Sequence, residues 1–306
     1  MRFAAIFLLT LLLLGPTSVE AQALKLQKGD HISVIGNTTA DRLQHHAWLE
    51  TYVHALHPEL DLTFRNLAFP GDELKSRPRE DNFGSPDQWL TKNESDVVFA
   101  FFGFNEAMRG PEAMDGFLKN LADVIDGMLS QTYNGDSPPR IVIFSPIAHE
   151  NLKSRHLPDG SKNNINLKLY SGGMQVVCKQ KNVVFVDLFN SSLALYEQAA
   201  KPLTMNGIHL LDHGNKALAS VIIPKLFDRD VPADDKVAKL REAVLDKNYH
   251  WFSRYRVVDG YNVFGGRSKL AWFGQSNADV MKREMEIFDI KTVNRDKIVW
   301  AVAQGS

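Results

Sequence analysis

Five short runs of mostly apolar residues recur along the first two thirds of the chain, and segments with a helical pattern separate them. The runs lie at 32–35, 62–69, 96–102, 141–144 and 183–188. The helical segments lie at 40–57, 111–131, 163–180 and 214–227. Nearly continuous apolar strands that alternate with helices are typical of a parallel sheet covered on both faces. With right-handed crossovers, we predict one parallel sheet with the strand order 2-1-3-4-5.

The pattern changes at about Pro232. Residues 233–245 and 279–299 predict two more helices, and the stretch 249–267 between them is rich in aromatic residues, Arg and Gly. Trp and Tyr beside Arg could form a binding surface for a sugar or a partner protein. The interpretation that we favour is that these side chains pack against the main domain and seal it. We therefore expect a main domain at 29–228 and a C-terminal helical and aromatic extension at 233–306.

The N-terminus has the pattern of a secretory signal peptide. Arg2 precedes an apolar run at 3–14, a Gly-Pro break follows, and Ala21 offers a small residue for cleavage. The run is short for a transmembrane helix, although an uncleaved anchor remains an alternative. We expect residues 1–21 to be removed and the protein to be secreted or periplasmic, with no membrane span after cleavage.

Composition narrows the classes of partner. The 306 residues are 44% hydrophobic and 23% charged, as in ordinary globular proteins. With 35 basic and 36 acidic side chains the net charge is -1, so no overall field favours nucleic acid or an anionic membrane. Cys178 is the single cysteine and can form no internal disulfide. No spaced set of His, Asp and Glu suggests a metal site, and nothing suggests a cofactor.

Polar residues follow the first three strands of the predicted sheet. The turns are Asn37-Thr38, Gly71-Asp72 and Asn105-Glu106. The carboxyl ends of parallel strands meet at one edge of a sheet, where ligands usually bind. At the first turn, the free N–H groups of a helix N-terminus could hold an anion or an oxyanion. Taken alone, this turn is explained most simply if Thr38 or Thr39 only caps the helix.

Four blocks in this order resemble the SGNH (GDSL-type) hydrolase family, which has a flavodoxin-like three-layer α/β/α sandwich. The blocks are Gly36-Asn37-Thr38, Gly71, Gly103-Phe104-Asn105-Glu106 and Asn206-Gly207-Ile208-His209. The resemblance covers about residues 29–228. More narrowly, the chain resembles the SGNH-type domains of secreted multidomain proteins from planctomycete-like bacteria. Further domains after residue 306 would then explain why the chain ends directly after an apolar run.

The resemblance implies a role for each matching residue. Thr38 stands where the family has its nucleophile, His209 is the base, and Asn206 stands where an Asp orients that base. The backbone N–H groups of Thr38 and Gly71 and the side chain of Asn105 would form the oxyanion hole. The substrate implied is an acyl ester of a small molecule or a carbohydrate.

Two of these positions depart from the family. The extra methyl group of Thr38 restricts the hydroxyl and crowds the path of attack. Asn206 supplies no negative charge, and in a serine protease the same Asp-to-Asn change costs roughly 10⁴-fold in turnover. Asp212 is a conceivable substitute carboxylate. Two functions therefore remain open: a secreted ester hydrolase, or a catalytically degenerate domain that binds a ligand or acts as a scaffold in a larger secreted protein.

The first testable prediction concerns export. We expect the mature protein to begin near Gln22, because cleavage after Ala21 removes the whole apolar run. Edman or mass-spectrometric sequencing of the exported protein measures this directly. Soluble cytoplasmic protein that retains Met1 would contradict the prediction.

Overall fold

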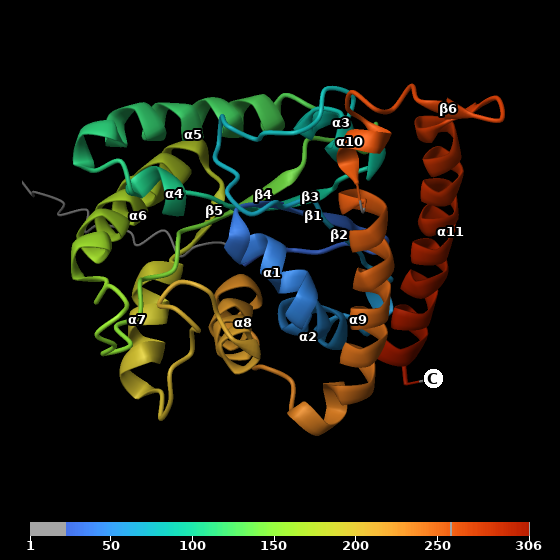
Figure 1. The fold of residues 1–306 in the computed structure, drawn as a ribbon. Coiled ribbons are helices and arrows are strands. Elements are labelled where there is room, and N and C mark those ends of the chain that lie inside the picture. Colours follow the sequence, from blue (N-terminus) through green and yellow to red (C-terminus); the bar gives the residue numbers. More distant parts are fainter. Residues whose placement is uncertain (1–22, 258, 306) are drawn as a thin grey trace, which may run out of the picture.

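A five-stranded parallel sheet with the order β2-β1-β3-β4-β5 lies at the centre of the protein (Figure 1). The computed structural model describes residues 23–257 and 259–305, and the predicted signal peptide lies outside them. The strands are β1 (His31–Gly36), β2 (Thr63–Asn66), β3 (Val97–Phe101), β4 (Arg140–Phe144) and β5 (Val184–Val186). The predicted strand order is confirmed.

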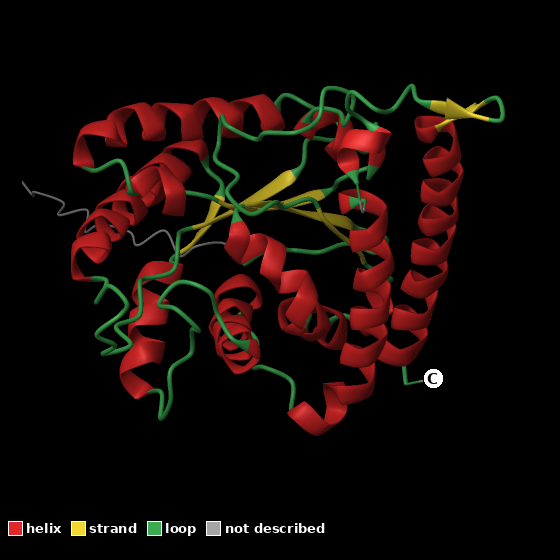
Figure 2. Ribbon diagram, viewed as in Figure 1, coloured by secondary structure: helices red, strands yellow, loops and turns green. Residues whose placement is uncertain are grey.

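Helices cover both faces of the sheet, because successive residues of each strand point to opposite sides. In β3, Val97 and Phe99 join one apolar core, and Val98 and Ala100 join the other. The first core is covered by α1 (Thr38–His46), α2 (Trp48–Leu56) and α8 (Asp212–Phe227) (Figure 2). The second is covered by α3 (Pro86–Lys92), α5 (Met114–Leu129) and α6 (Ser161–Lys181). The predicted three-layer α/β/α sandwich is thus confirmed.

The segment 40–57, predicted as one helix, forms two. The buried residue Ala47 has a φ of 61°, and its N–H donates to the carbonyl of Leu43 to end α1. A left-handed residue of this kind stops a helix and redirects the chain. As a result, α2 starts in a new direction and packs Leu49 and Tyr52 into the first core.

Several short elements were not predicted. These are η1 (Pro58–Leu60), α4 (Phe104–Ala107) and α7 (Leu188–Gln198), besides α3. The predicted helix 111–131 begins with a short 3₁₀ turn, η2 (Pro111–Ala113), before α5. Two of the unpredicted helices begin at a side-chain cap, Ser85 for α3 and Asp187 for α7. A cap is a local signal that an analysis of apolar spacing does not detect.

The C-terminal extension packs against the outer edge of the sheet. It consists mainly of α9 (Asp234–Arg256) and α11 (Asn277–Ala303), which run beside β2 (Figure 1). Between them lie α10 (Gly260–Val263) and a hairpin of β6 (Ala271–Trp272) and β7 (Gln275–Ser276). In the part of the chain that the structure describes, no helix is both long and apolar enough to cross a membrane.

Two aromatic residues of α9 seal the main domain, as the favoured interpretation of the segment 249–267 predicts. The indole N–H of Trp251 donates to the carbonyl of Asn66 at 2.8 Å, and the hydroxyl of Tyr255 donates to the carbonyl of Leu67 at 3.0 Å. Both side chains are buried. Tyr249, in contrast, is 66% exposed.

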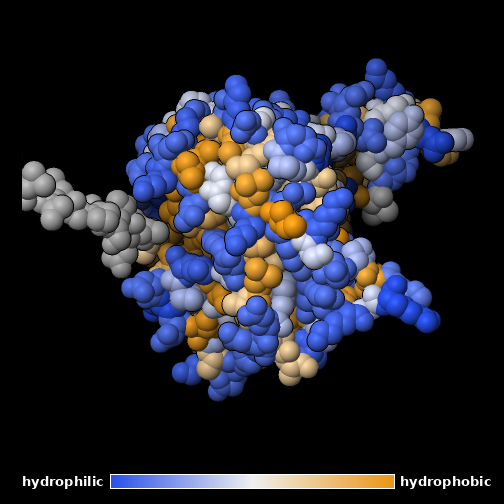
Figure 3. Space-filling view, turned by 90° about the vertical axis from the view of Figure 1, so that its left-hand side faces the viewer, coloured by the Kyte–Doolittle hydropathy of each residue, from blue (hydrophilic) through white to orange (hydrophobic). Residues whose placement is uncertain are grey.

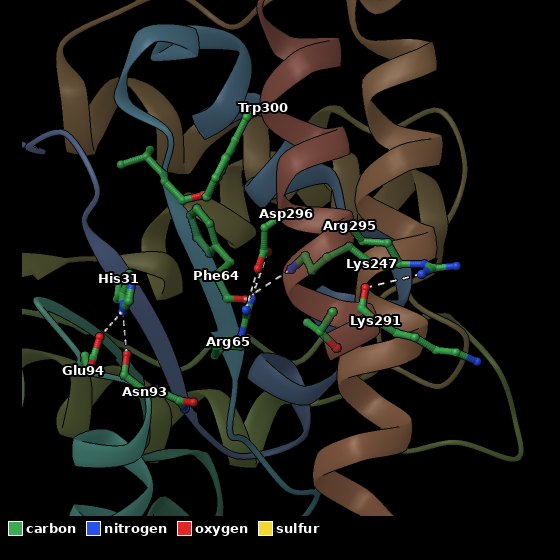
Figure 4. A network of polar contacts seen from close by, with 12 residues as sticks. His31, Phe64, Arg65, Asn93, Glu94, Lys247, Lys291, Arg295, Asp296 and Trp300 are labelled. Carbon is green, nitrogen blue, oxygen red and sulfur yellow. Dashed lines mark hydrogen bonds and ion pairs between the residues drawn. The ribbon is translucent and has the colours of Figure 1, made fainter. Parts of the chain in front are cut away.

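Buried ion pairs tie the extension to β2 and α2. The guanidinium of Arg65 donates to both carboxylate oxygens of Asp296, at 3.0 and 2.5 Å (Figure 4). The ammonium group of Lys247 lies 2.6 Å from the carboxylate of Glu50 and donates to the carbonyl of Phe64 at 3.3 Å. All four charged side chains are buried. An edge strand that would otherwise expose free backbone groups is thereby covered.

We predict that Asp296→Ala lowers the free energy of unfolding by about 3–5 kcal/mol, because it leaves the charge of Arg65 buried without a partner. Urea unfolding measures the change. Asp246→Ala is the matched control, since the Asp246–Arg295 pair also holds α11, to α9 at 2.6 Å, but is exposed. Asp246→Ala should lower the free energy of unfolding by at most about 1 kcal/mol. Equal losses in the two variants would contradict the prediction.

Candidate active site

The turns after β1, β2 and β3 are joined by backbone hydrogen bonds. The N–H of Asn37 donates to the carbonyl of Phe101 at 3.1 Å, and the N–H of Phe69 donates to the carbonyl of Gly36 at 3.2 Å. A Cβ atom at Gly36 would lie 2.2 Å from the Phe101 carbonyl oxygen. Only glycine therefore allows the ends of β1 and β3 to approach so closely. Three of the four sequence blocks thus meet at one edge of the sheet.

Asn37 caps α1, so the interpretation that Thr38 or Thr39 caps the helix is wrong. The Asn37 side-chain oxygen accepts a hydrogen bond from the N–H of Thr39 at 3.0 Å. Thr38 is the first residue of the helix and is half-buried. Its hydroxyl forms no hydrogen bond within the described part of the chain. The N-terminus of α1 is therefore capped without the hydroxyl of Thr38.

The donors predicted for an oxyanion hole lie on these three turns. The backbone N–H groups of Thr38 and Gly71 donate to no acceptor among residues 23–257 and 259–305. The side-chain amide of Asn105 donates one long hydrogen bond, 3.3 Å, to the carbonyl of Asp72. This bond joins the second turn to the third and leaves one amide hydrogen of Asn105 free.

A buried carboxylate also holds the second and third turns together. Glu106 accepts hydrogen bonds from the N–H of Leu74 and the N–H of Gly103, each at 3.0 Å. Burial raises the pKa of Glu106, while the two N–H donors oppose the rise. Its neighbour Asn105 is therefore held in place by Glu106 in the backbone and by the hydrogen bond of its own side chain to Asp72. Glu106 belongs to the third sequence block, but the block pattern assigns no role to it.

His209 lies in a closed turn before α8. An antiparallel bridge between Thr204 and Leu210 closes the turn. The Asn206 side-chain oxygen accepts from the backbone N–H groups of Ile208 at 3.3 Å and of His209 at 3.0 Å. The His209 Nδ1 atom lies 2.9 Å from the amide nitrogen of Asn206 and 3.1 Å from its oxygen. Asn206 and His209 are therefore paired, as the resemblance implies.

Glu150 anchors this turn to the loop after β4. Its buried carboxylate accepts from the N–H of Leu203 at 3.0 Å and from the N–H and hydroxyl of Thr204 at 2.7 and 2.6 Å. The residue next to it, His149, fills the space where a side chain on Gly207 would lie, 2.4 Å from a Cβ atom built there. Glu150 was missed because its partners lie more than 50 residues away along the chain. In the sequence, the one signal that could have identified Glu150 is a charged residue a few positions after a buried strand.

Arg42 connects the His209 turn to α1. Its guanidinium donates to the carbonyl of Leu210 at 3.1 Å. Burial lowers the pKa of His209, and the positive charge of Arg42 lowers it further. The neutral imidazole is therefore favoured, which is the form that a general base requires. Because α1 begins at Thr38, this contact brings the fourth block toward the other three.

Two expected pairings are not formed. Thr38 and His209 are not hydrogen-bonded to each other, although such bonds are often long before a substrate binds. The carboxylate of Asp212 accepts from Trp48 at 3.1 Å and from Arg241 at 2.5 Å, and it lies 3.2 Å from the Nδ1 atom of His46. Asp212 is thus engaged elsewhere and does not replace the missing carboxylate. In addition, no group of three or more His, Cys, Asp or Glu residues in the described ranges could hold a metal ion.

The Asn206–His209 pair leaves the position of the imidazole proton undecided. An amide can present either a hydrogen or an oxygen to Nδ1, and both Asn206 atoms lie within hydrogen-bond distance of it. If Nδ1 accepts, Nε2 carries the proton and cannot receive one from a nucleophile. A carboxylate offers only acceptors, so it would place the proton on Nδ1.

We predict that Asn206→Asp raises the pKa of His209 by about one unit or more, because a negative charge next to the ring stabilises the imidazolium. It should also move the proton of the neutral ring to Nδ1. Titration of the ring nitrogens by ¹⁵N NMR measures both effects. Asn163→Asp is the matched control: Asn163 lies 3.0 Å from the Nδ1 atom of His149, so this change should affect only that histidine. An unchanged pKa of His209 in Asn206→Asp would contradict the prediction.

Comparison with known proteins shows similarity at the level of the fold. No protein-family model and no curated relative matches the chain. An acetylxylan esterase from Geobacillus stearothermophilus superposes with a TM-score of 0.54 at 15% identity, over 69% of this chain and 100% of that one. A gut microbial diltiazem-metabolizing enzyme gives a TM-score of 0.53 at 16% identity, over 67% of this chain and 49% of that one. This chain thus spans about half the length of the second enzyme, and it has the α/β fold of both.

Proposed function

We propose that this protein is a secreted hydrolase of acyl esters, among them carbohydrate esters, and that it belongs to the SGNH (GDSL-type) hydrolases. Thr38 is the nucleophile, His209 is the base, and Asn206 orients His209. The observation that carries the proposal is the set of three donors at one sheet edge. Within the described ranges, the N–H groups of Thr38 and Gly71 have no acceptor, and one amide hydrogen of Asn105 is free.

The structural neighbours support this choice of reaction. The superposed enzyme from Geobacillus stearothermophilus is an acetylxylan esterase, and its catalytic mutants change a serine, an aspartate and a histidine. The aspartate and the histidine are three positions apart in that enzyme. Asn206 and His209 have the same spacing here. The spacing places the orienting group and the base within one turn.

In the proposed mechanism, the hydroxyl of Thr38 attacks the carbonyl carbon of the ester and gives its proton to Nε2 of His209. The carbonyl oxygen becomes negative and is held by the donors of Thr38, Gly71 and Asn105. When the C–O bond to the alcohol breaks, the imidazolium returns the proton to the leaving oxygen. Water, activated by His209 in the same way, then releases the acid from Thr38.

A second candidate is a catalytically degenerate domain that binds a ligand or organises a larger secreted protein, such as those of planctomycete-like bacteria. Three observations favour it: Thr38 carries an extra methyl group, Asn206 supplies no charge, and Thr38 and His209 are not hydrogen-bonded. In that case the donors at the sheet edge bind a ligand without cleaving it.

A substitution series tests the roles of Thr38 and Asn206, and the activity of the wild type itself separates the two candidates. Thr38→Ser removes a methyl group from the path of attack, and Asn206→Asp fixes the proton on Nδ1 of His209. We expect the double variant to hydrolyse p-nitrophenyl acetate at least about tenfold faster than either single variant, because groups of one triad act together. Initial rates at saturating ester measure this.

Two controls complete the series. Thr38→Ala should abolish the activity of the wild type, whereas Thr39→Ala changes the neighbouring hydroxyl and should leave the activity intact. If no variant hydrolyses any short acyl ester while the wild type binds a glycan or a protein ligand, the proposal is wrong and the second candidate holds.

A further inference from the structure

A cavity of about 260 Å³ lies beside the candidate active site, behind the turn that follows β2. None of Thr38, Asn105 and His209 lines it. Asp72 connects the candidate active site with the cavity. Its backbone carbonyl accepts a hydrogen bond from Asn105, and the residue also lines the cavity. The volume is just below the range of about 300–1,000 Å³ that is typical of ligand pockets. The cavity is therefore large enough for a small molecule.

Aromatic rings form much of the cavity wall. Phe83, Trp89 and Tyr255 line it, and their rings contact one another at centroid distances of 4.8 to 5.3 Å. The polar atoms of two of them are already used, since the Trp89 indole donates to the Phe83 carbonyl and the Tyr255 hydroxyl to the Leu67 carbonyl. These rings therefore present apolar, flat surfaces, which suit a planar ligand.

One of the two arginines that line the cavity is already neutralised. Arg79 forms a bidentate ion pair with the buried carboxylate of Asp72, at 2.8 and 2.7 Å. Its guanidinium also stacks 3.5 Å from the centre of the Phe69 ring. Neither Arg79 nor Asp72 is left to bind a ligand ion.

The second arginine has no matching anion. The guanidinium of Arg77 makes only two long hydrogen bonds to backbone carbonyls, 3.3 Å to Glu73 and 3.4 Å to Leu74. In the ranges that the structure describes, no carboxylate forms an ion pair with it. Burial lowers the pKa of Arg77, and the charge of Asp72 offsets this only in part. A cation with unused donors thus lines the cavity beside the aromatic rings.

Two acidic residues at the cavity, Glu80 and Asp81, do not form an ion pair with Arg77. The carboxylate of Glu80 is turned toward the segment after α10, where a Cβ atom at Gly265 would lie 2.5 Å from its Oε2 atom. Glu80 and Asp81 are both exposed, so solvent and salt screen their charges. Arg77 is half-buried, so its charge is screened less than theirs.

We propose that this cavity binds a small organic carboxylate with a planar ring, whose carboxylate pairs with Arg77 and whose ring packs against the aromatic wall formed by Phe83, Trp89 and Tyr255. A guanidinium binds a carboxylate through two parallel hydrogen bonds, which matches the free donors of Arg77. The proposal does not depend on ester hydrolysis. It gives the C-terminal extension a direct part in binding, because Tyr255 belongs to α9.

Benzoate and its neutral analogue benzamide test the proposal on the full mature protein. Binding is followed by ¹H–¹⁵N NMR at the indole N–H of Trp89, assigned with Trp89→Phe. We expect benzoate to shift this signal at millimolar concentration and to bind at least about tenfold more tightly than benzamide, as expected for a hydrogen-bonded charge pair.

Arg77→Gln should weaken benzoate binding by about tenfold or more and leave benzamide binding unchanged. Lys75→Gln is the matched control, because it removes the same charge from an exposed position on the same loop and should not change the affinity. Thr38→Ala should also bind benzoate like the wild type, which separates this site from the proposed hydrolase chemistry.

The thermal unfolding midpoint of Arg77→Gln shows whether the variant is folded. If it is not, the comparison of benzoate with benzamide in the wild type decides. Equal affinities for the two probes, an unchanged benzoate affinity in folded Arg77→Gln, or no shift of the Trp89 signal would each overturn the proposal.

Discussion

The outer edge of β2 is covered by buried ion pairs, and the position of the C-terminal extension depends on them. Arg65 of this strand pairs with Asp296 of α11, while Lys247 of α9 pairs with Glu50 of α2. Loss of one partner would leave a buried charge uncompensated, at a cost of about 3–5 kcal/mol. The pairs therefore hold α9 and α11 in one position along the sheet, where apolar packing alone would allow sliding.

Because α9 is held in this way, the extension supports both candidate sites. Arg256 of α9 donates to the carboxylate of Asp41 in α1 at 2.9 Å, so it braces the helix that begins at Thr38. One residue earlier, Tyr255 forms part of the cavity wall. The extension thus reaches the first turn of the candidate active site and the neighbouring cavity from the same short stretch of α9.

At the candidate active site, the supporting structure is complete while two reacting positions differ from the family pattern. Glu106 and Glu150 fix the turns that carry Asn105 and His209. A fixed set of donors lowers the barrier because no reorganisation is needed when negative charge develops. In the proposed mechanism, the departures at Thr38 and Asn206 affect the nucleophile and the proton on the imidazole, and they leave this set of donors unchanged.

The sequence alone determined the sheet, its strand order and the edge at which the turns after β1, β2 and β3 meet, because apolar runs and strand-to-helix turns are local patterns. It did not determine the break at Ala47, which depends on a backbone conformation that the apolar spacing does not encode. It also left Asp212 open as a partner of His209, whereas folding pairs Asp212 with Arg241. The cavity was beyond prediction, since Arg77 and Tyr255 are far apart in the chain and only the packing of α9 against the sheet brings them together.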